Sequence, residues 1–97
     1  TLSIRETFSG LVESFQPDPR MSIRVEKALQ YIQLKADGMT SADLRSSLGG
    51  VDGQEFSGIK RSLDVFADAY AQTESGDDRK FLLDELKVAM FQKGVPL

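Results

Sequence analysis

The sequence contains no cysteine and no histidine among its 97 residues. Without cysteine, the chain can form no disulfide framework, thiolate zinc site or thiol nucleophile, so its fold must rely on packing alone. Without histidine, it lacks the commonest general base and the commonest metal ligand, which excludes the usual Ser/His/Asp and Cys/His catalytic arrangements. These absences predict a protein that is not an enzyme and that needs no metal ion or other cofactor.

Long hydrophobic runs are also missing. No stretch approaches the roughly 20 apolar residues that a membrane-spanning helix needs, and Thr1 to Glu6 lack the basic-then-apolar layout of a signal peptide. We therefore expect a soluble, cytoplasmic protein without a membrane partner, and secretion with a removed or absent leader is left as an alternative. The first residue is not Met, so the chain also fits a domain excised from a longer protein.

The composition that is present suits one small globular domain. Hydrophobic residues make up 40% and charged residues 28% of the chain, close to the averages for such domains. A chain of this length buries roughly two thirds of the surface that its unfolded form exposes, which is enough for one core. We expect a single, acidic domain over residues 1–97, with a formal net charge of −3.

Apolar residues recur at helical spacing, and no segment alternates with period two, so the sequence predicts an all-α fold. The expected architecture is a compact bundle of about five helices, and a short proline-containing link predicts that the first two pack as a hairpin. The predicted helices run from Ser3 to Phe15, from Asp18-Pro19 to Gly38, from Thr40 to Leu48, from Asp52 to about Gln72, and from Asp77 to Lys93.

Two of these helix starts have the same capping pattern, twelve residues apart. Each has an apolar residue, an N-cap residue, an acid at the third helical position and an apolar residue at the fourth, which is the layout of a hydrophobic staple around a capping pair. The residues are Met39, Thr40, Asp43 and Leu44 in the first case, and Val51, Asp52, Glu55 and Phe56 in the second. Gly58 inside the later helix indicates either close packing or simple tolerance, because glycine costs about 1 kcal/mol there relative to alanine.

The last predicted helix is apolar on two sides. Its main face carries Leu82, Leu83, Leu86, Ala89 and Met90, and a second face carries Phe81, Val88 and Phe91. One interpretation is a central helix covered by its own neighbours, and the other is a face that binds another protein or a second copy of the chain. The second helix shows a weaker version, with Ile23, Leu34 and Tyr31 away from its main stripe, where isolated exposed apolar residues are expected.

The segment from Ala28 to Leu63 resembles a helix-turn-helix unit, with a leading helix, a short helix, a glycine turn and a longer helix. The resemblance implies DNA binding by the longer helix, with Arg45, Lys60 and Arg61 as candidate contacts. The local charge opposes this function, because Met39 to Gln72 hold three basic residues against five acidic ones. DNA affinity depends strongly on neutralising phosphates.

The absence of catalytic and metal-binding patterns, together with the second apolar face of the last helix, favours a non-enzymatic regulatory or adaptor module. Such a module binds another protein or itself. Phe81, Val88 and Phe91 are its candidate partner-binding residues. Acidic helical domains of this size often serve as anti-activators, secretion-associated regulators or inhibitors, which is an analogy at the level of class alone. The alternative is a transcriptional regulator with a degenerate helix-turn-helix, acting as a dimer through its last helix.

Overall fold

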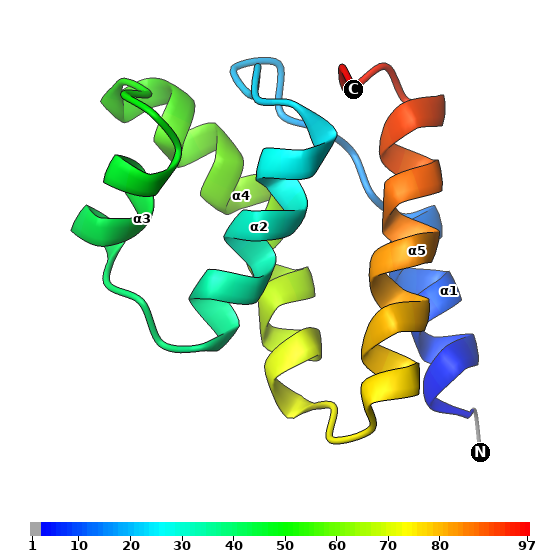
Figure 1. Ribbon diagram of the computed structural model, residues 1–97. Helices are drawn as coiled ribbons and strands as arrows, with labels where there is room; N and C mark the ends of the chain where they lie inside the picture. Colours follow the sequence, from blue (N-terminus) through cyan, green and yellow to red (C-terminus); the bar gives the residue numbers. More distant parts are fainter. Residues whose placement is uncertain (1–2) are drawn as a thin grey trace.

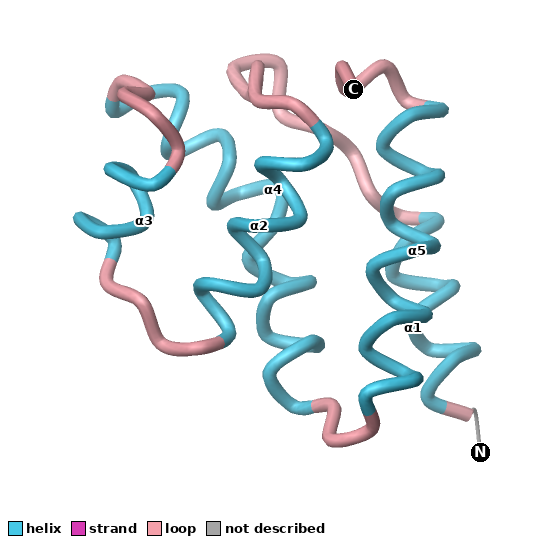
Figure 2. Tube along the Cα trace, in the orientation of Figure 1, coloured by secondary structure: helices cyan, strands magenta, loops and turns pink. Residues whose placement is uncertain are grey.

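The helical spacing of the apolar residues produces five α-helices and no strand in residues 3–97, the part of the chain that the computed structural model describes (Figures 1 and 2). The all-α prediction is confirmed. The helices are α1 (Ile4–Glu13), α2 (Val25–Ala36), α3 (Ser41–Ser47), α4 (Gly53–Gln72) and α5 (Gly76–Gln92).

Side-chain caps begin four of the five helices. The side-chain oxygen accepts the amide N–H of the residue three positions later, at 3.1 Å for Ser3, 3.3 Å for Thr40, 2.8 Å for Asp52 and 3.3 Å for Ser75. Each bond satisfies an amide that the helix itself leaves without an acceptor. The predicted starts of α1, α3 and α4 are confirmed, and α5 begins one residue before its predicted start.

The predicted start of α2 at Asp18-Pro19 is wrong. The Asp18 carboxylate accepts the backbone N–H of Arg20 at 2.9 Å, and the Asp18 carbonyl accepts that of Met21 at 2.9 Å, so these residues close a turn. Aspartate followed by proline is as typical of such turns as of helix starts. The helix begins only at Val25, after Arg24, whose side chain makes no capping bond.

Four of the five helices form two pairs, and the expected hairpin of the first two helices is absent. α2 packs mainly on α4, whereas α1 packs mainly on α5, from the other end of the sequence. Figure 1 shows α4 and α1 behind α2 and α5, and the shortest dimension of the molecule, 19 Å, matches two layers of helices. α2 contacts α3, α4 and α5, so α2 rather than α5 is the central helix.

The core also includes residues that the sequence placed on the outer side of α2. Tyr31 is fully buried, and its ring meets that of Phe56 edge to face at 6.2 Å between centroids. Ile23 is buried just before the helix begins, and Leu34 is half-buried. The expectation of isolated exposed residues on this side is therefore wrong, because α2 is covered on more than one side.

Gly58 lies where the loop between α1 and α2 crosses α4. A methyl group at this position would stand 3.0 Å from Asp18 Oδ1 and 3.2 Å from Arg20 Cβ. The Asp18 backbone N–H donates to Ser62 Oγ on the same helix at 2.8 Å, which holds the loop in place. Of the two explanations for this glycine, close packing is confirmed.

Gly58→Ala is therefore expected to lower the free energy of unfolding by about 1 kcal/mol, although alanine is the better helix former. The Asp18 carboxylate cannot move aside easily, because Arg20 donates to both of its oxygens. In an Asp18→Ala background the same substitution should cost less, because the contact with the carboxylate is gone and only the one with Arg20 Cβ remains. Urea unfolding of the four variants tests this, and an equal effect in both backgrounds would contradict the packing explanation.

Candidate functional site

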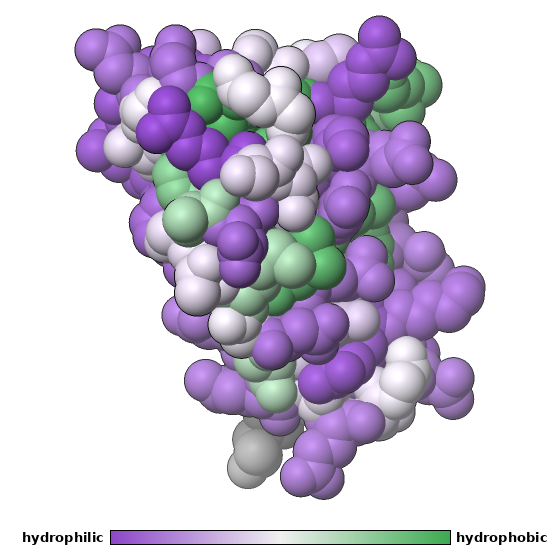
Figure 3. Space-filling model, turned by 60° about the vertical axis from the view of Figure 1, so that its left-hand side comes forward, coloured by the Kyte–Doolittle hydropathy of each residue, from purple (hydrophilic) through white to green (hydrophobic). Residues whose placement is uncertain are grey.

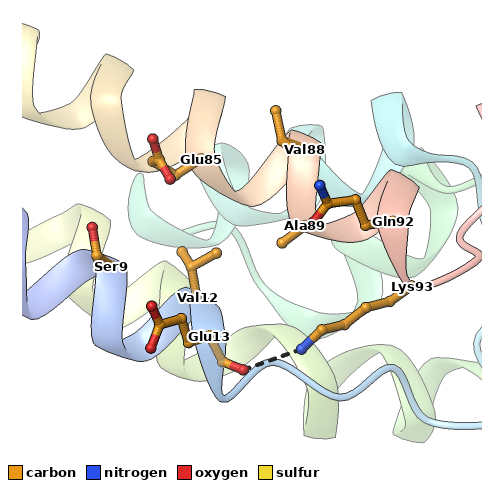
Figure 4. A pocket seen from close by; sticks show the side chains of 8 residues that line it. All are labelled: Ser9, Val12, Glu13, Glu85, Val88, Ala89, Gln92 and Lys93. Atoms are coloured by element: carbon orange, nitrogen blue, oxygen red, sulfur yellow. Dashed lines mark hydrogen bonds between the residues drawn. The ribbon is translucent and has the colours of Figure 1, made fainter.

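The second apolar face of α5 is largely open to solvent. Val88 and Phe91 are 56% and 58% exposed, whereas Leu82, Leu86, Ala89 and Met90 on the main face are buried. Figure 4 shows the Val88 side chain pointing away from α1 while Ala89 points toward it. The helix is thus buried on one side only, and we call Phe81, Val88 and Phe91 the outer face of α5.

Phe81 differs from the other two residues of the outer face because α1 partly covers it. The Arg5 guanidinium lies 5.0 Å from the centre of the Phe81 ring, and Arg5 Nε is 2.9 Å from Asp78 Oδ1. The cation therefore contacts both an aromatic face and a carboxylate. The three predicted partner-binding residues share one side of α5, but only Val88 and Phe91 are freely exposed.

A groove of about 360 Å³ runs between α1 and α5 beside Val88. Its walls combine apolar and charged side chains, and Lys93 closes one end by donating from Nζ to the Glu13 carbonyl at 3.2 Å (Figure 4). Lys93 Nζ also donates to the Phe15 carbonyl. The lining residues are Ser9, Val12, Glu13, Glu85, Val88, Ala89, Gln92 and Lys93.

No family model, curated protein or solved structure matches this chain.

A second groove, of about 390 Å³, lies on the opposite side of α1, against α4. Ile4 and Val65 stand at its rim, 43% and 48% exposed, and Phe8 and Leu11 line its inner part. Asp68 is the one charged residue among its lining residues. This groove is mostly apolar, but it lies away from the outer face of α5.

The three candidate DNA contacts make separate interactions within the protein. Arg45 Nε donates to the Val51 carbonyl at 2.8 Å, across the turn between α3 and α4. Lys60 Nζ lies 5.9 Å from the centre of the Phe56 ring, and Arg61 lies 3.7 Å from the Asp18 carboxylate. Arg45 therefore supports a turn, and Arg61 faces an acid.

The first turn of α4 carries two acids. Asp52 caps the helix, and the Glu55 carboxylate accepts a hydrogen bond from the Ser22 hydroxyl. In a helix-turn-helix this turn would approach the DNA, so both carboxylates would stand near phosphates. The order of short helix, turn and long helix is present, but its charge is opposite to the charge that DNA requires.

One partly buried polar network was not foreseen from the sequence. Tyr31 Oη donates to Asp64 Oδ1 at 2.7 Å, and Lys35 Nζ lies 3.0 Å from Asp64 Oδ2. Burial, and then the hydrogen bond to Asp64, raises the pKa of the Tyr31 hydroxyl well above its usual value. The position of Tyr31 beside Ala28 and Ile32 was the only sequence signal for its burial, and nothing local pointed to Asp64.

The Asp18 carboxylate is the other perturbed acid. Its side chain is almost fully buried, and the hydrogen bonds from the side chain and backbone of Arg20 lower its pKa to about 2. The Arg61 guanidinium acts in the same direction. The low pKa of Asp18 thus results from the hydrogen bonds that close the turn. Asp18 stays charged, and its side chain points inward rather than toward a groove.

Figure 3 shows the apolar residues of one face in small groups separated by hydrophilic ones. Within residues 3–97, no group of three or more acidic side chains is arranged to hold a metal ion. In the same range, no helix is long and apolar enough to cross a membrane. Among the large hydrophobic side chains on the helices of residues 3–97, Val88 and Phe91 on the outer face of α5 are the most exposed.

Proposed function

We propose that this protein is a non-enzymatic regulatory or adaptor module that binds another protein through the outer face of α5. The observation that carries the proposal is the exposure of Val88 and Phe91 on a helix whose other side buries Leu82, Leu86 and Met90 in the core. Neither residue is needed to cover the core. Large apolar side chains exposed together are typical of interaction sites.

The surroundings of the outer face suit a protein interface. Phe91 and the half-buried Phe81 are aromatic, a residue class that contributes strongly to binding. Asp84, Glu85 and Lys87 are exposed around them, and Lys80 pairs with Asp84 at 3.1 Å. An apolar centre with a charged rim of both signs is the usual anatomy of an interface between proteins.

Val88→Asp and Phe91→Asp are expected to abolish association while leaving the helical circular dichroism spectrum unchanged. A carboxylate at the centre of an interface costs 2 kcal/mol or more of binding, which is about a 30-fold loss of affinity. The measurement is parallel capture from source-cell extract with wild-type and variant protein, followed by mass spectrometry. Sedimentation equilibrium of the same proteins reports self-association.

Val65→Asp is the matched control, because Val65 is similarly exposed but lies on α4. It should retain the partners that Val88→Asp loses. Equal retention by all three variants, or unfolding of Val88→Asp and Phe91→Asp, would overturn the proposal. The alternative is DNA binding through Arg45, Lys60 and Arg61. It is tested by a gel shift with mixed-sequence DNA at low salt, in which DNA binding requires a shifted band at micromolar protein.

A further inference from the structure

We propose that the outer face of α5 binds a second copy of this chain, docked so that the two α5 helices lie antiparallel. This inference rests on the proposed function, because it uses the same face, and it names the protein that binds there. The order of charges along the exposed side of α5 carries it, because that order complements itself when the helix is reversed.

Four exposed side chains form a straight stripe along α5. They recur at spacings of four, three and four residues, as do the side chains through which one helix contacts another. The stripe consists of Lys80, Asp84, Lys87 and Phe91. The side chains of Lys80 and Asp84 are 77% and 63% exposed, and Phe91 is 58% exposed. In a single copy, the stripe therefore faces solvent.

A second copy, reversed about the middle of the stripe, matches it contact by contact. In this register, Asp84 of each copy faces Lys87 of the other, which makes two equivalent ion pairs. Lys80 of each copy faces the Phe91 ring of the other, which makes two equivalent cation–π contacts. Each member of the stripe thus gains an attractive partner, and no two like charges of the stripe face each other.

The two other residues of the outer face flank the stripe on the side of α1. Phe81 contacts Arg5 of α1, and Val88 lines the groove between α1 and α5. A twofold axis keeps the same flank of both helices together, so Phe81 of each copy lies within about 3 Å, along the helix axis, of Val88 of the other. Both apolar side chains are then buried between the copies.

Glu85 is the exposed acid of this stretch that the register leaves out. Helical spacing places it further round α5 than Val88, next to Ala89 and the groove beside α1. It therefore has no facing charge in the second copy. This position makes Glu85 a matched control for its neighbour Asp84.

The side of α5 that carries the stripe is accessible to a second copy. α5 lies at one edge of the molecule, in the front layer of Figure 1. The antiparallel arrangement also places the positive N-terminal end of each helix near the negative C-terminal end of the other. One pair of helices makes a smaller contact than the roughly 1,200 Å² of stable interfaces, so the expected dissociation constant is micromolar.

Sedimentation equilibrium of the full chain from about 1 to 200 µM tests the dimer, and the wild type should change from monomer to dimer across this range. Asp84→Lys and Lys87→Asp should each raise the dissociation constant about tenfold, because each converts both ion pairs into contacts between like charges. Glu85→Lys makes the same charge change beside the stripe and should leave the constant unchanged. Circular dichroism of all three variants should match the wild type, since these side chains are exposed.

An equimolar mixture of Asp84→Lys and Lys87→Asp tests the register. In the mixed dimer each introduced charge faces an opposite charge on the other variant, so the mixture should associate as tightly as the wild type. A monomeric wild type at the highest concentration, equal weakening by Glu85→Lys, or no recovery in the mixture would overturn the inference. If the wild type is monomeric but Val88→Asp still loses a captured protein, the second copy is rejected and the proposed function stands.

Discussion

Leu86→Asp is expected to unfold this protein at neutral pH, whereas Phe91→Asp, five residues later on the same helix, leaves it folded. Leu86 is fully buried on the main face of α5, and Phe91 is more than half exposed. A carboxylate at position 86 loses its hydration without gaining a partner, which costs several kcal/mol in addition to the lost leucine packing. The sum approaches or exceeds the 5–15 kcal/mol that typically stabilises a small domain.

Circular dichroism at 222 nm and its thermal midpoint measure the contrast between these two variants. Leu86→Ala is the matched control, since it removes the same apolar group without adding charge and should cost about 2–5 kcal/mol. A cooperative thermal transition for Leu86→Asp close to that of the wild type would show that this side of α5 is not core.

The second large effect is a loss of stability at alkaline pH that depends on Tyr31. The pKa of this hydroxyl is raised in the folded protein, so the unfolded chain releases the proton first as the pH rises past about 10. The contribution of Tyr31 is therefore complete below pH 10 and is lost as the pH increases toward the folded pKa. The expected slope is about 1.4 kcal/mol per pH unit.

Tyr31→Phe removes this titration. At pH 7 the variant should be less stable than the wild type by about 1 kcal/mol, because Asp64 loses one hydrogen-bond donor. The difference should shrink above pH 10 and then change sign. Urea unfolding of both proteins between pH 8 and 11.5 measures it. Parallel pH profiles would contradict this account of Tyr31.

The helix starts were predictable because their causes are local. Ser3, Thr40 and Asp52 each bind an amide three residues away, so the relevant atoms stand close together in the sequence. The same rule failed at Asp18, because this residue closes a turn and its amide binds Ser62, 44 residues away. The local pattern of aspartate and proline does not distinguish the two uses.

Long-range pairing explains most of what the sequence did not predict. The two faces of α5 were identified from helical spacing, but the covering of Phe81 depends on Arg5, more than 70 residues earlier. Helical spacing placed Tyr31 on an outer edge of its helix, because spacing within one helix does not show that Asp64 of α4 lies beside it. Helical periodicity shows which side chains share a face, whereas the topology of the chain decides which neighbour covers it.

The packing of α1 on α5 also has a consequence for biosynthesis. Arg5 meets Asp78, a separation of 73 residues, so α1 cannot dock until nearly all of the described chain has left the ribosome. At roughly 5–20 residues per second, Phe8 and Val12 wait about 4–15 s for their binding surface. During translation, the apolar side chains of this segment therefore stay uncovered, and they can be buried only once α5 has emerged.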